Sequence, residues 1–108
     1  MAKRDPPKPP HPGDLIKLIR RLAEDGKISW SDHAFDERSP ERGIEIADVL
    51  EVFRLGDIEG EITPGKRRGE WKCCVVGKLQ WTSREAGVVT VVAGKTKLIV
   101  VTVEWMDP

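Results

Sequence analysis

The sequence predicts a single α+β domain in which N-terminal helices pack on a small curved antiparallel sheet. Apolar residues in the first half recur at intervals of three and four, the spacing of amphipathic helices. The second half is rich in Val, Ile, Thr and Trp, which is typical of strands. With 108 residues, 39% of them hydrophobic, the chain is large enough for one buried core.

Most of the eight prolines fall within residues 1–13, a segment that also lacks hydrophobic periodicity. Proline removes a backbone donor and interrupts both helices and sheet ladders. We therefore expect residues 1–13 to form a disordered tail and residues 14–108 to form the folded domain.

The first predicted helix covers residues 14–25. Asp14 offers a side-chain oxygen to the free amides of the first turn, and Gly26 follows as a C-terminal stop. The inward face has apolar residues at helical spacing, namely Leu15, Leu18, Ile19 and Leu22. The outer face carries Lys17, Arg20 and Arg21.

Residues 27–31 predict a short strand or an extended segment that leads into a second helix. Ser31 or Asp32 can cap that helix. It should end at Ser39 and Pro40, because a residue that precedes proline avoids helical geometry.

A third helix is predicted before Gly56. Apolar residues there repeat the helical spacing once more, at Ile46, Val49, Leu50 and Phe53. Gly56 supplies the C-terminal stop.

Three antiparallel strands in a meander are predicted for residues 70–79, 87–93 and 97–105, with polar or turn-forming segments between them. Alternation in the last strand places four residues on one face: Ile99, Val101, Val103 and Trp105. We expect Ile99 and Val101 to be buried against the first and third helices. Helices should cover one face of the sheet and at most part of the other.

The formal charge is zero, but the two halves of the chain differ. Residues 1–60 hold 10 basic and 13 acidic residues, whereas residues 61–108 hold 8 and 5. The basic excess lies between residues 62 and 97. Such a patch suits a phosphate backbone or an acidic partner, and dispersed surface lysines of a small domain explain it equally well.

No apolar run approaches the roughly 18 to 20 residues that cross a bilayer, and the amino terminus lacks the apolar centre of a secretory signal. We expect a soluble, cytoplasmic protein. Cys73 and Cys74 are adjacent in a predicted strand, so they point to opposite faces and do not pair with each other. Without a CxxC motif they are interpreted as small buried thiols, and neither a metal nor a cofactor is expected.

Several short motifs follow one another along the chain: His33-Ala34, Arg38, Arg42-Gly43-Ile44, Asp48-Val49 and, in the last strand, Ile99-Val100-Val101-Thr102-Val103. Their order and spacing resemble those of an uncharacterised bacterial family grouped with the BrnT and RelE toxin superfamily. The resemblance covers about residues 28–105. It implies an α+β fold with a curved antiparallel sheet. For the characterised relatives, it also implies RNA cleavage held in check by an antitoxin of the zinc-finger or helix-turn-helix type.

A second, weaker similarity rests on Lys3-Arg4, on the first helix closed by Gly26, and on Trp71 at the start of the first long strand. It is to the motility quorum-sensing-regulator type of messenger-RNA interferase. That type has a glutamine directly after the tryptophan and a tyrosine on the next strand. This chain has Lys72 at the first position and no tyrosine at all, so those two catalytic groups do not carry over.

Metal-free cleavage of RNA requires a base for the 2′-hydroxyl proton, an acid for the leaving 5′-oxygen, and cations for the phosphate. The candidate catalytic residues are His33, Arg38 and Lys72, because imidazole titrates near neutrality and cations stabilise phosphate charge. The candidate residues for binding RNA or phosphate are Arg42, Arg67, Arg68 and Trp71. Trp71 and Trp81 are both able to stack on bases.

Each of these residues also has a structural explanation. His33 can hydrogen-bond a backbone carbonyl, Arg38 can pair with Glu41, and the tryptophans can pack in the core or at its edge. The leading hypothesis is therefore the toxin of a type II toxin–antitoxin system, acting as an RNA endonuclease. The alternative is a non-catalytic protein- or RNA-binding module of the same fold. The expected partners are a cognate antitoxin and RNA or the ribosome, with no membrane.

Overall fold

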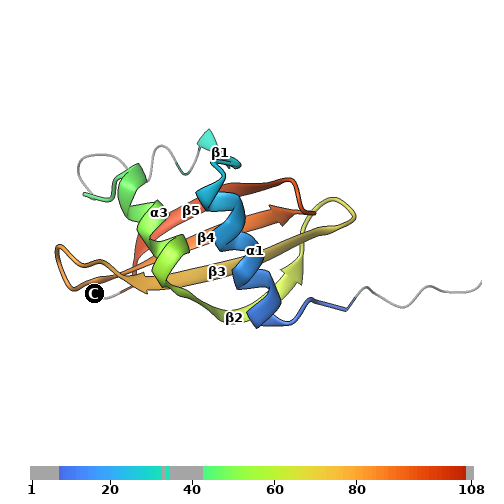
Figure 1. Cartoon of the computed structure of the whole chain (residues 1–108), viewed down its shortest axis with the longest axis horizontal. Helices are drawn as coiled ribbons and strands as arrows, with labels where there is room; N and C mark the ends of the chain where they lie inside the picture. The colour runs from blue at the N-terminus through green and yellow to red at the C-terminus, as the bar shows by residue number, and fades with distance from the viewer. Residues whose placement is uncertain (1–7, 33, 35–42, 107–108) are drawn as a thin grey trace, which may run out of the picture.

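The computed structural model describes residues 8–32, 34 and 43–106 of the chain. Its elements are α1 (Pro12–Glu24), β1 (Ile28–Trp30), α3 (Ile46–Leu55), β2 (Asp57–Pro64), β3 (Glu70–Lys78), β4 (Glu85–Ala93) and β5 (Lys97–Trp105). The strands form one sheet in the order β1-β5-β4-β3-β2, and the two described helices lie on one side of it (Figure 1). The predicted α+β fold, with an N-terminal helix packed on a mostly antiparallel sheet, is confirmed.

Helix α1 begins two residues earlier than the sequence pattern predicts. Pro12 is its first residue, a position where the missing N–H needs no partner and the fixed φ suits a helix. The N-cap is His11, whose Nδ1 accepts a hydrogen bond from the N–H of Gly13 at 3.0 Å. Asp14 is therefore an acidic residue of the first turn rather than the cap, and the predicted boundary at residue 14 was wrong. Residues 1–7 of the predicted tail lie outside the described residues.

Strand β1 confirms the extended segment predicted after the first helix, and it pairs in parallel with the first half of β5. The hydroxyl of Ser31, which follows β1, donates to the Val101 carbonyl at 3.1 Å and accepts from the N–H of Ala34 at 3.0 Å. The second of these bonds is that of a capping serine, and Ser31 is one of the two predicted caps, Ser31 or Asp32. The remainder of the predicted second helix, with its stop at Ser39 and Pro40, lies outside the described residues.

Helix α3 is the third predicted helix, and Gly56 is its C-cap as expected. The helix starts with a capping box, in which the Glu45 N–H donates to Asp48 Oδ2 at 2.9 Å and the Glu45 side chain accepts from the Asp48 backbone. Gly56 is extended, so it is not required for a left-handed turn. A Cβ atom there would lie 2.5 Å from the carbonyl oxygen of Val76. The glycine therefore permits the close approach of α3 to β3.

Strand β2 is not predicted by the sequence, because four of its eight residues are acidic or polar and two more are a glycine and a proline. Ile58 and Ile62 pack against the core, and the other residues of the strand are exposed. Between Glu59 and Thr63, β2 advances four residues while its partner β3 advances two. Gly60 adopts a φ of +80° at this bulge. Backbone pairing with β3, more than burial of its side chains, therefore holds β2 at the edge of the sheet.

Strands β3, β4 and β5 form the predicted antiparallel meander, but β5 contains a bulge. Val89 on β4 pairs with Thr102, whereas the next residue, Thr90, pairs with Val100. Val101 is therefore an extra residue in β5. A bulge of this kind interrupts the alternation of faces, and the residues before and after it follow different phases.

The bulge reverses the faces predicted for the start of β5. The residues that face the helices, all 0% exposed, are Leu98, Val100 and Val103. Ile99 and Val101 are half-buried on the opposite side of the sheet, where they line a pocket. The prediction that Ile99 and Val101 are buried against the first and third helices is wrong, since uniform alternation does not account for an inserted residue.

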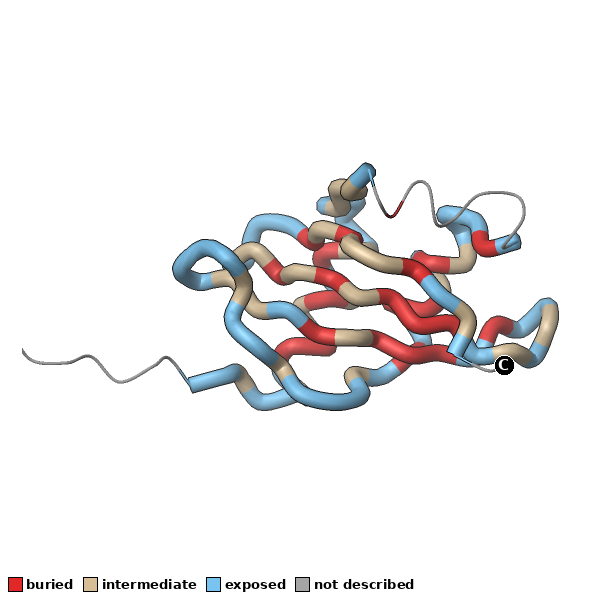
Figure 2. Tube along the Cα trace, turned by 180° about the vertical axis from the view of Figure 1, so that it is seen from behind, coloured by how far each residue is buried: buried red, intermediate tan, exposed pale blue. Residues whose placement is uncertain are grey.

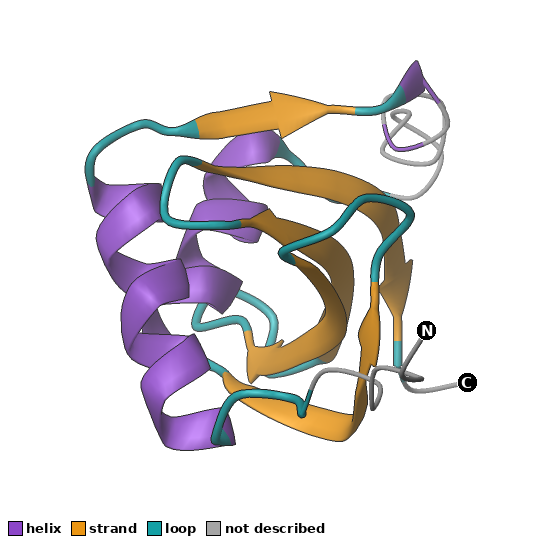
Figure 3. Ribbon diagram, turned by 90° about the vertical axis from the view of Figure 1, so that its right-hand side faces the viewer, coloured by secondary structure: helices purple, strands orange, loops and turns teal. Residues whose placement is uncertain are grey.

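The core fills the space between the helices and one face of the curved sheet (Figure 3). The helices bury two sets of residues there, Leu15, Ile16, Ile19 and Leu22 from α1 and Val49, Val52 and Phe53 from α3. No helix among the described residues covers the opposite face of the sheet, which is called the open face below (Figure 2). Half-buried side chains from β4 and β5 lie on it, including Val89, Val91, Ile99 and Val101.

Candidate functional site

Four cationic residues lie around one pocket on the open face, at the end of the sheet where β3 begins. They line a pocket of about 830 Å³, called the open-face pocket, and they are Lys66, Arg67, Lys72 and Lys97. Glu70 is the carboxylate among the described lining residues, which leaves a net formal charge of +3. A region of this charge favours phosphate or carboxylate ligands.

Two of these cations, Lys66 and Arg67, lie in the loop between β2 and β3, and hydrogen bonds fix the conformation of this loop. The Gly65 N–H donates to the Glu70 carbonyl at 2.8 Å, and this bond closes the loop. The backbone N–H of Arg67 donates to Glu70 Oε1 at 3.1 Å. The carboxylate of Glu70 therefore stabilises the conformation of the loop that presents Lys66 and Arg67.

Lys72 lies on the sheet itself, two residues into β3. It pairs with Thr63 of β2 and with Val91 of β4, and its side chain is exposed on the open face. The floor of the pocket beside it is apolar and consists of Val91, Ala93, Ile99 and Val101. A single-stranded nucleic acid matches both features, because its phosphates bind cations and its bases bind apolar or aromatic surfaces.

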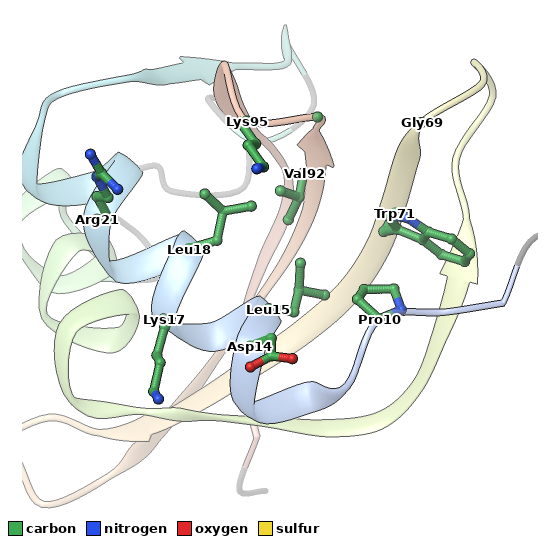
Figure 4. A pocket seen from close by; sticks show the side chains of 11 residues that line it. Pro10, Asp14, Leu15, Lys17, Leu18, Arg21, Gly69, Trp71, Val92 and Lys95 are labelled. Carbon is green, nitrogen blue, oxygen red and sulfur yellow. The ribbon is translucent and has the colours of Figure 1, made fainter.

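Trp71 and Lys72 are neighbours in the sequence but lie on opposite faces of the sheet, as alternation along a strand requires. Trp71 pairs with Val92 and lies on the helix side, beside Pro10 and in the same pocket as Leu15 and Leu18 of α1 (Figure 4). The sequence groups Trp71 and Lys72 in one candidate site. The structure instead assigns them to two different pockets.

The pocket of Trp71, called the helix-side pocket, has a volume of about 530 Å³ and lies between α1 and the ends of β3 and β4 (Figure 4). Its interior is apolar and consists of Pro10, Leu15, Leu18, Trp71 and Val92. Its border is charged, with Asp14, Lys17, Arg21 and Lys95. In Figure 4 the ammonium group of Lys95 points towards the apolar interior, whereas Lys17 points away from it.

The two pockets share one end of the sheet. The N–H of Gly94, in the β4–β5 turn, donates to the carbonyl of Gly69 in the β2–β3 loop at 3.2 Å. Lys95 on this turn lines the helix-side pocket, and Lys97 after it lines the open-face pocket. Arg68 lies exposed in the same loop as Gly69 and lines neither of these two pockets.

Trp81, the other predicted stacking residue, lies in the β3–β4 turn at the opposite end of β3. Trp81 is 64% exposed, and its ring stands edge-on to that of Trp105, with 6.4 Å between the ring centroids. The guanidinium of Arg84 lies 4.0 Å from the centroid of Trp105. Trp81 therefore contributes to neither of the two pockets.

Cys73 and Cys74 are free thiols on opposite faces, as predicted. Burial raises the pKa of Cys73 to about 12, and Cys74 beside it adds to the shift. Burial also raises the pKa of Cys74, with Glu104 and Glu59 acting in the same direction. Because the thiolate is the reactive form, both cysteines are poor nucleophiles at neutral pH.

Three predicted site residues, His33, Arg38 and Arg42, lie outside the described residues. Ser31, two residues before His33 in the sequence, lines the open-face pocket. Of the candidate catalytic residues, the described part of the chain thus contains Lys72. It lies in the same pocket as Arg67.

Lys66, Lys95 and Lys97 belong to the predicted basic excess and line the two pockets, but they were not among the individual site residues predicted from the sequence. A signal for them was present in the predicted meander. Antiparallel order brings the start of β3, the end of β4 and the start of β5 to one end of the sheet. Cations that flank these three strand ends in the sequence therefore had to lie close together.

Comparison of the chain with protein-family models, with curated proteins and with solved structures finds no match. Within residues 8–32, 34 and 43–106, no group of three or more His, Cys, Asp or Glu side chains is arranged to hold a metal ion. No helix in these ranges is both long and apolar enough to cross a membrane. The two pockets and their charges are therefore the structural basis for assigning a function.

Proposed function

We propose that the protein binds RNA in its open-face pocket and cleaves it, as the toxin of a type II toxin–antitoxin system in the cytoplasm. The observation that supports RNA binding is that Lys66, Arg67, Lys72 and Lys97 line one pocket with an apolar floor. Cations of this density bind the phosphates of a single strand, and the floor accommodates parts of the bases. Cleavage as the activity is supported by the resemblance to the toxin superfamily.

The proposed reaction needs no group beyond the side chains of the chain. A base accepts the proton of the 2′-hydroxyl, and the 2′-oxygen attacks the adjacent phosphorus. The bond from phosphorus to the 5′-oxygen then breaks, and an acid protonates that oxygen. The products are a 2′,3′-cyclic phosphate and a 5′-hydroxyl. His33 is proposed as the acid or base, and Lys72 with Arg38 is proposed to stabilise the charge on the phosphate.

The second candidate function is a non-catalytic binding module. It is favoured by the apolar part of the open face, where Val89, Val91, Ile99 and Val101 are half-buried and no described helix covers them. Apolar sheet surfaces of this kind commonly bind a protein partner. In either case the proposed protein partner is a cognate antitoxin of the zinc-finger or helix-turn-helix type.

Lys72 and Lys78 provide a matched pair for testing the proposal. Both are exposed on β3, and their separation of six residues places both on the open face, but Lys72 alone of the two lines the pocket. Affinity for a single-stranded RNA oligonucleotide should fall with added salt. Lys72→Glu should make the log-log slope shallower by roughly 0.7 for each phosphate that the variant no longer neutralises. Lys78→Glu should leave the slope unchanged.

Cleavage of the same oligonucleotide, followed by electrophoresis, distinguishes the two candidate functions. A toxin nuclease should shorten the RNA and arrest growth when it is expressed. If the protein binds the RNA but does not cleave it, with or without ribosomes, the nuclease is excluded and the non-catalytic binding module is supported. RNA binding that is absent at low salt, or equally affected by Lys72→Glu and Lys78→Glu, would contradict the proposed interface.

A further inference from the structure

The helix-side pocket differs from the open-face pocket because it contains an aromatic ring. Trp71 is half-buried, with Leu15 and Leu18 of α1 and Val92 of β4 among the other lining residues (Figure 4). The volume of the helix-side pocket, about 530 Å³, falls within the range of roughly 300–1,000 Å³ that is typical of small-molecule sites. The pocket is therefore large enough for a small ligand or for one unit of a polymer.

The charges at its border are unevenly distributed. Lys95 points towards the interior from the β4–β5 turn, whereas the guanidinium of Arg21 on α1 points away from it and Asp14 lies near the start of α1 (Figure 4). Among the residues that the structure describes, the ion pair within 4.0 Å joins Arg20 to Asp57. No described carboxylate therefore lies within ion-pair distance of Lys95 or Arg21, and both remain able to bind an anion.

We infer that the helix-side pocket binds one nucleotide of the RNA, with its base against Trp71 and its phosphate at Lys95, on the border that also carries Arg21. This inference rests on the proposed function and extends it to a second subsite. The combination of features favours a nucleotide over an aliphatic anion, because the ring of a base gains a stacking contact with an indole.

The position of the pocket supports the same ligand. The hydrogen bond from Gly94 to Gly69 joins the turn and the loop that separate the two pockets. Lys95 and Lys97 follow Gly94 in the chain and line different pockets. A strand of RNA in the open-face pocket can thus cross the rim of the sheet and place a neighbouring nucleotide beside Trp71.

Small ligands allow the pocket to be tested separately from RNA binding. AMP carries both a base and a phosphate, adenosine lacks the phosphate, ribose 5-phosphate lacks the base, and hexyl phosphate replaces the base by an alkyl chain. Titrations are followed by NMR of the indole N–H resonances, and the Trp71 signal is assigned with Trp71→Phe. AMP should shift the Trp71 resonance and bind more tightly than each of the other three compounds.

Three substitutions examine the predicted contacts. Lys95→Gln and Arg21→Gln should each weaken AMP binding without lowering the melting temperature, because both side chains are exposed. Lys78→Gln, at the other end of β3, is the control and should have no effect. Trp71→Leu should weaken binding of an RNA oligonucleotide by roughly 5- to 150-fold, the range expected for loss of one stacked base.

The outcomes separate this inference from the proposed function. If AMP leaves Trp71 unaffected, or hexyl phosphate binds as tightly as AMP, the nucleotide subsite is refuted, while salt-dependent RNA binding through Lys72 can still hold. If AMP binds at Trp71 but RNA affinity does not depend on Lys72, the proposed open-face interface fails and the pocket remains. Should Trp71→Leu not fold, unchanged AMP affinity in Lys95→Gln and Arg21→Gln still overturns the inference.

Discussion

The indole N–H of Trp81 donates a hydrogen bond to Oδ1 of Asp48 across 2.8 Å and connects the β3–β4 turn to the first turn of α3. The other oxygen of this carboxylate accepts from the N–H of Glu45 at 2.9 Å. A neighbouring bond runs from the N–H of Gln80 to Oε2 of Glu51 at 2.9 Å. Asp48 thus stabilises the start of the helix and the position of the turn at the same time.

Asp48→Ala should lower the free energy of unfolding by about 1 to 2 kcal/mol, because it removes both a helix cap and the acceptor for Trp81. Trp81→Phe removes the indole donor and part of a largely exposed ring, and it should cost less. Urea denaturation of the two single variants and the double variant gives the coupling energy between the residues. Strictly additive effects would show that the hydrogen bond contributes nothing to stability.

The bulge in β5 makes opposite predictions for adjacent valines. Val100 is 0% exposed and faces the helices, so Val100→Asp should bury an unpaired charge and prevent folding, a loss of more than about 4 kcal/mol. Val101 is half-buried on the open face, so Val101→Asp should remain folded with a modestly reduced melting temperature. Circular dichroism and thermal melts distinguish the two variants. A folded Val100→Asp protein would contradict the assignment of Val100 to the face of β5 that packs against the helices.

Two glycines should differ in their tolerance of a methyl group. At Gly56 an added Cβ would lie 2.5 Å from the Val76 carbonyl oxygen and 2.6 Å from that of Val52, so Gly56→Ala should separate α3 from β3 and cost about 3 kcal/mol. At Gly60 the space is open but φ is +80°, so Gly60→Ala should cost only about 1 kcal/mol. Denaturant midpoints measure both changes. Equal losses would mean that the α3–β3 contact is not close.

Stability should decrease with pH in the alkaline range because of Cys73. Burial raises the pKa of its thiol from the ordinary value of 9.0 to about 12, so between these values only the unfolded chain ionises. The contribution of the Cys73 thiol to the free energy of unfolding is therefore complete below pH 9. Above pH 9 this contribution decreases by up to about 1.4 kcal/mol per pH unit. Urea denaturation at several alkaline pH values should show a steeper decline for the wild type than for Cys73→Ala. Parallel declines would exclude this role of Cys73.

His33→Ala tests the proposed chemistry. Loss of a general acid or base should reduce cleavage by roughly 10²- to 10⁴-fold per folded molecule while RNA affinity and melting temperature remain nearly unchanged. Arg38→Ala should lose activity in the same way if its guanidinium stabilises the phosphate. Activity is divided by the folded fraction for the wild type and both variants. A lower melting temperature with unchanged specific activity would assign the residues a structural role.

Much of the fold follows from regular patterns in the sequence. The spacing of apolar residues predicts α1 and α3, and alternation with turn residues predicts β3, β4 and β5. Strand β2 escapes prediction because only Ile58 and Ile62 are apolar at core positions and the remaining residues are exposed. The strand is held by backbone hydrogen bonds to β3, and such pairing cannot be recognised from the amino-acid composition of β2.

The candidate site is predictable in its charge but not in its geometry. The basic segment between residues 62 and 97 supplies Arg67 and Lys72, which do meet in one pocket. The division between Trp71 and Lys72 follows from strand alternation and could have been derived from the sequence. The bulge at Val101 could not, because an extra residue in one strand is defined only by its partner strand.

The parallel pairing of β1 with β5 has a consequence for the order of folding. Ile28 lies opposite Leu98, a separation of 70 positions in the sequence, and β5 lies between β1 and β4 in the sheet. Loop closure over such a distance must be completed before β1 gains its backbone partners, which slows folding relative to proteins with local contacts. During synthesis, helix α1 and β1 exist long before β5 is translated. Until then the edge of β4 has no neighbour on that side, and the nascent chain is most exposed to aggregation or to capture by a chaperone.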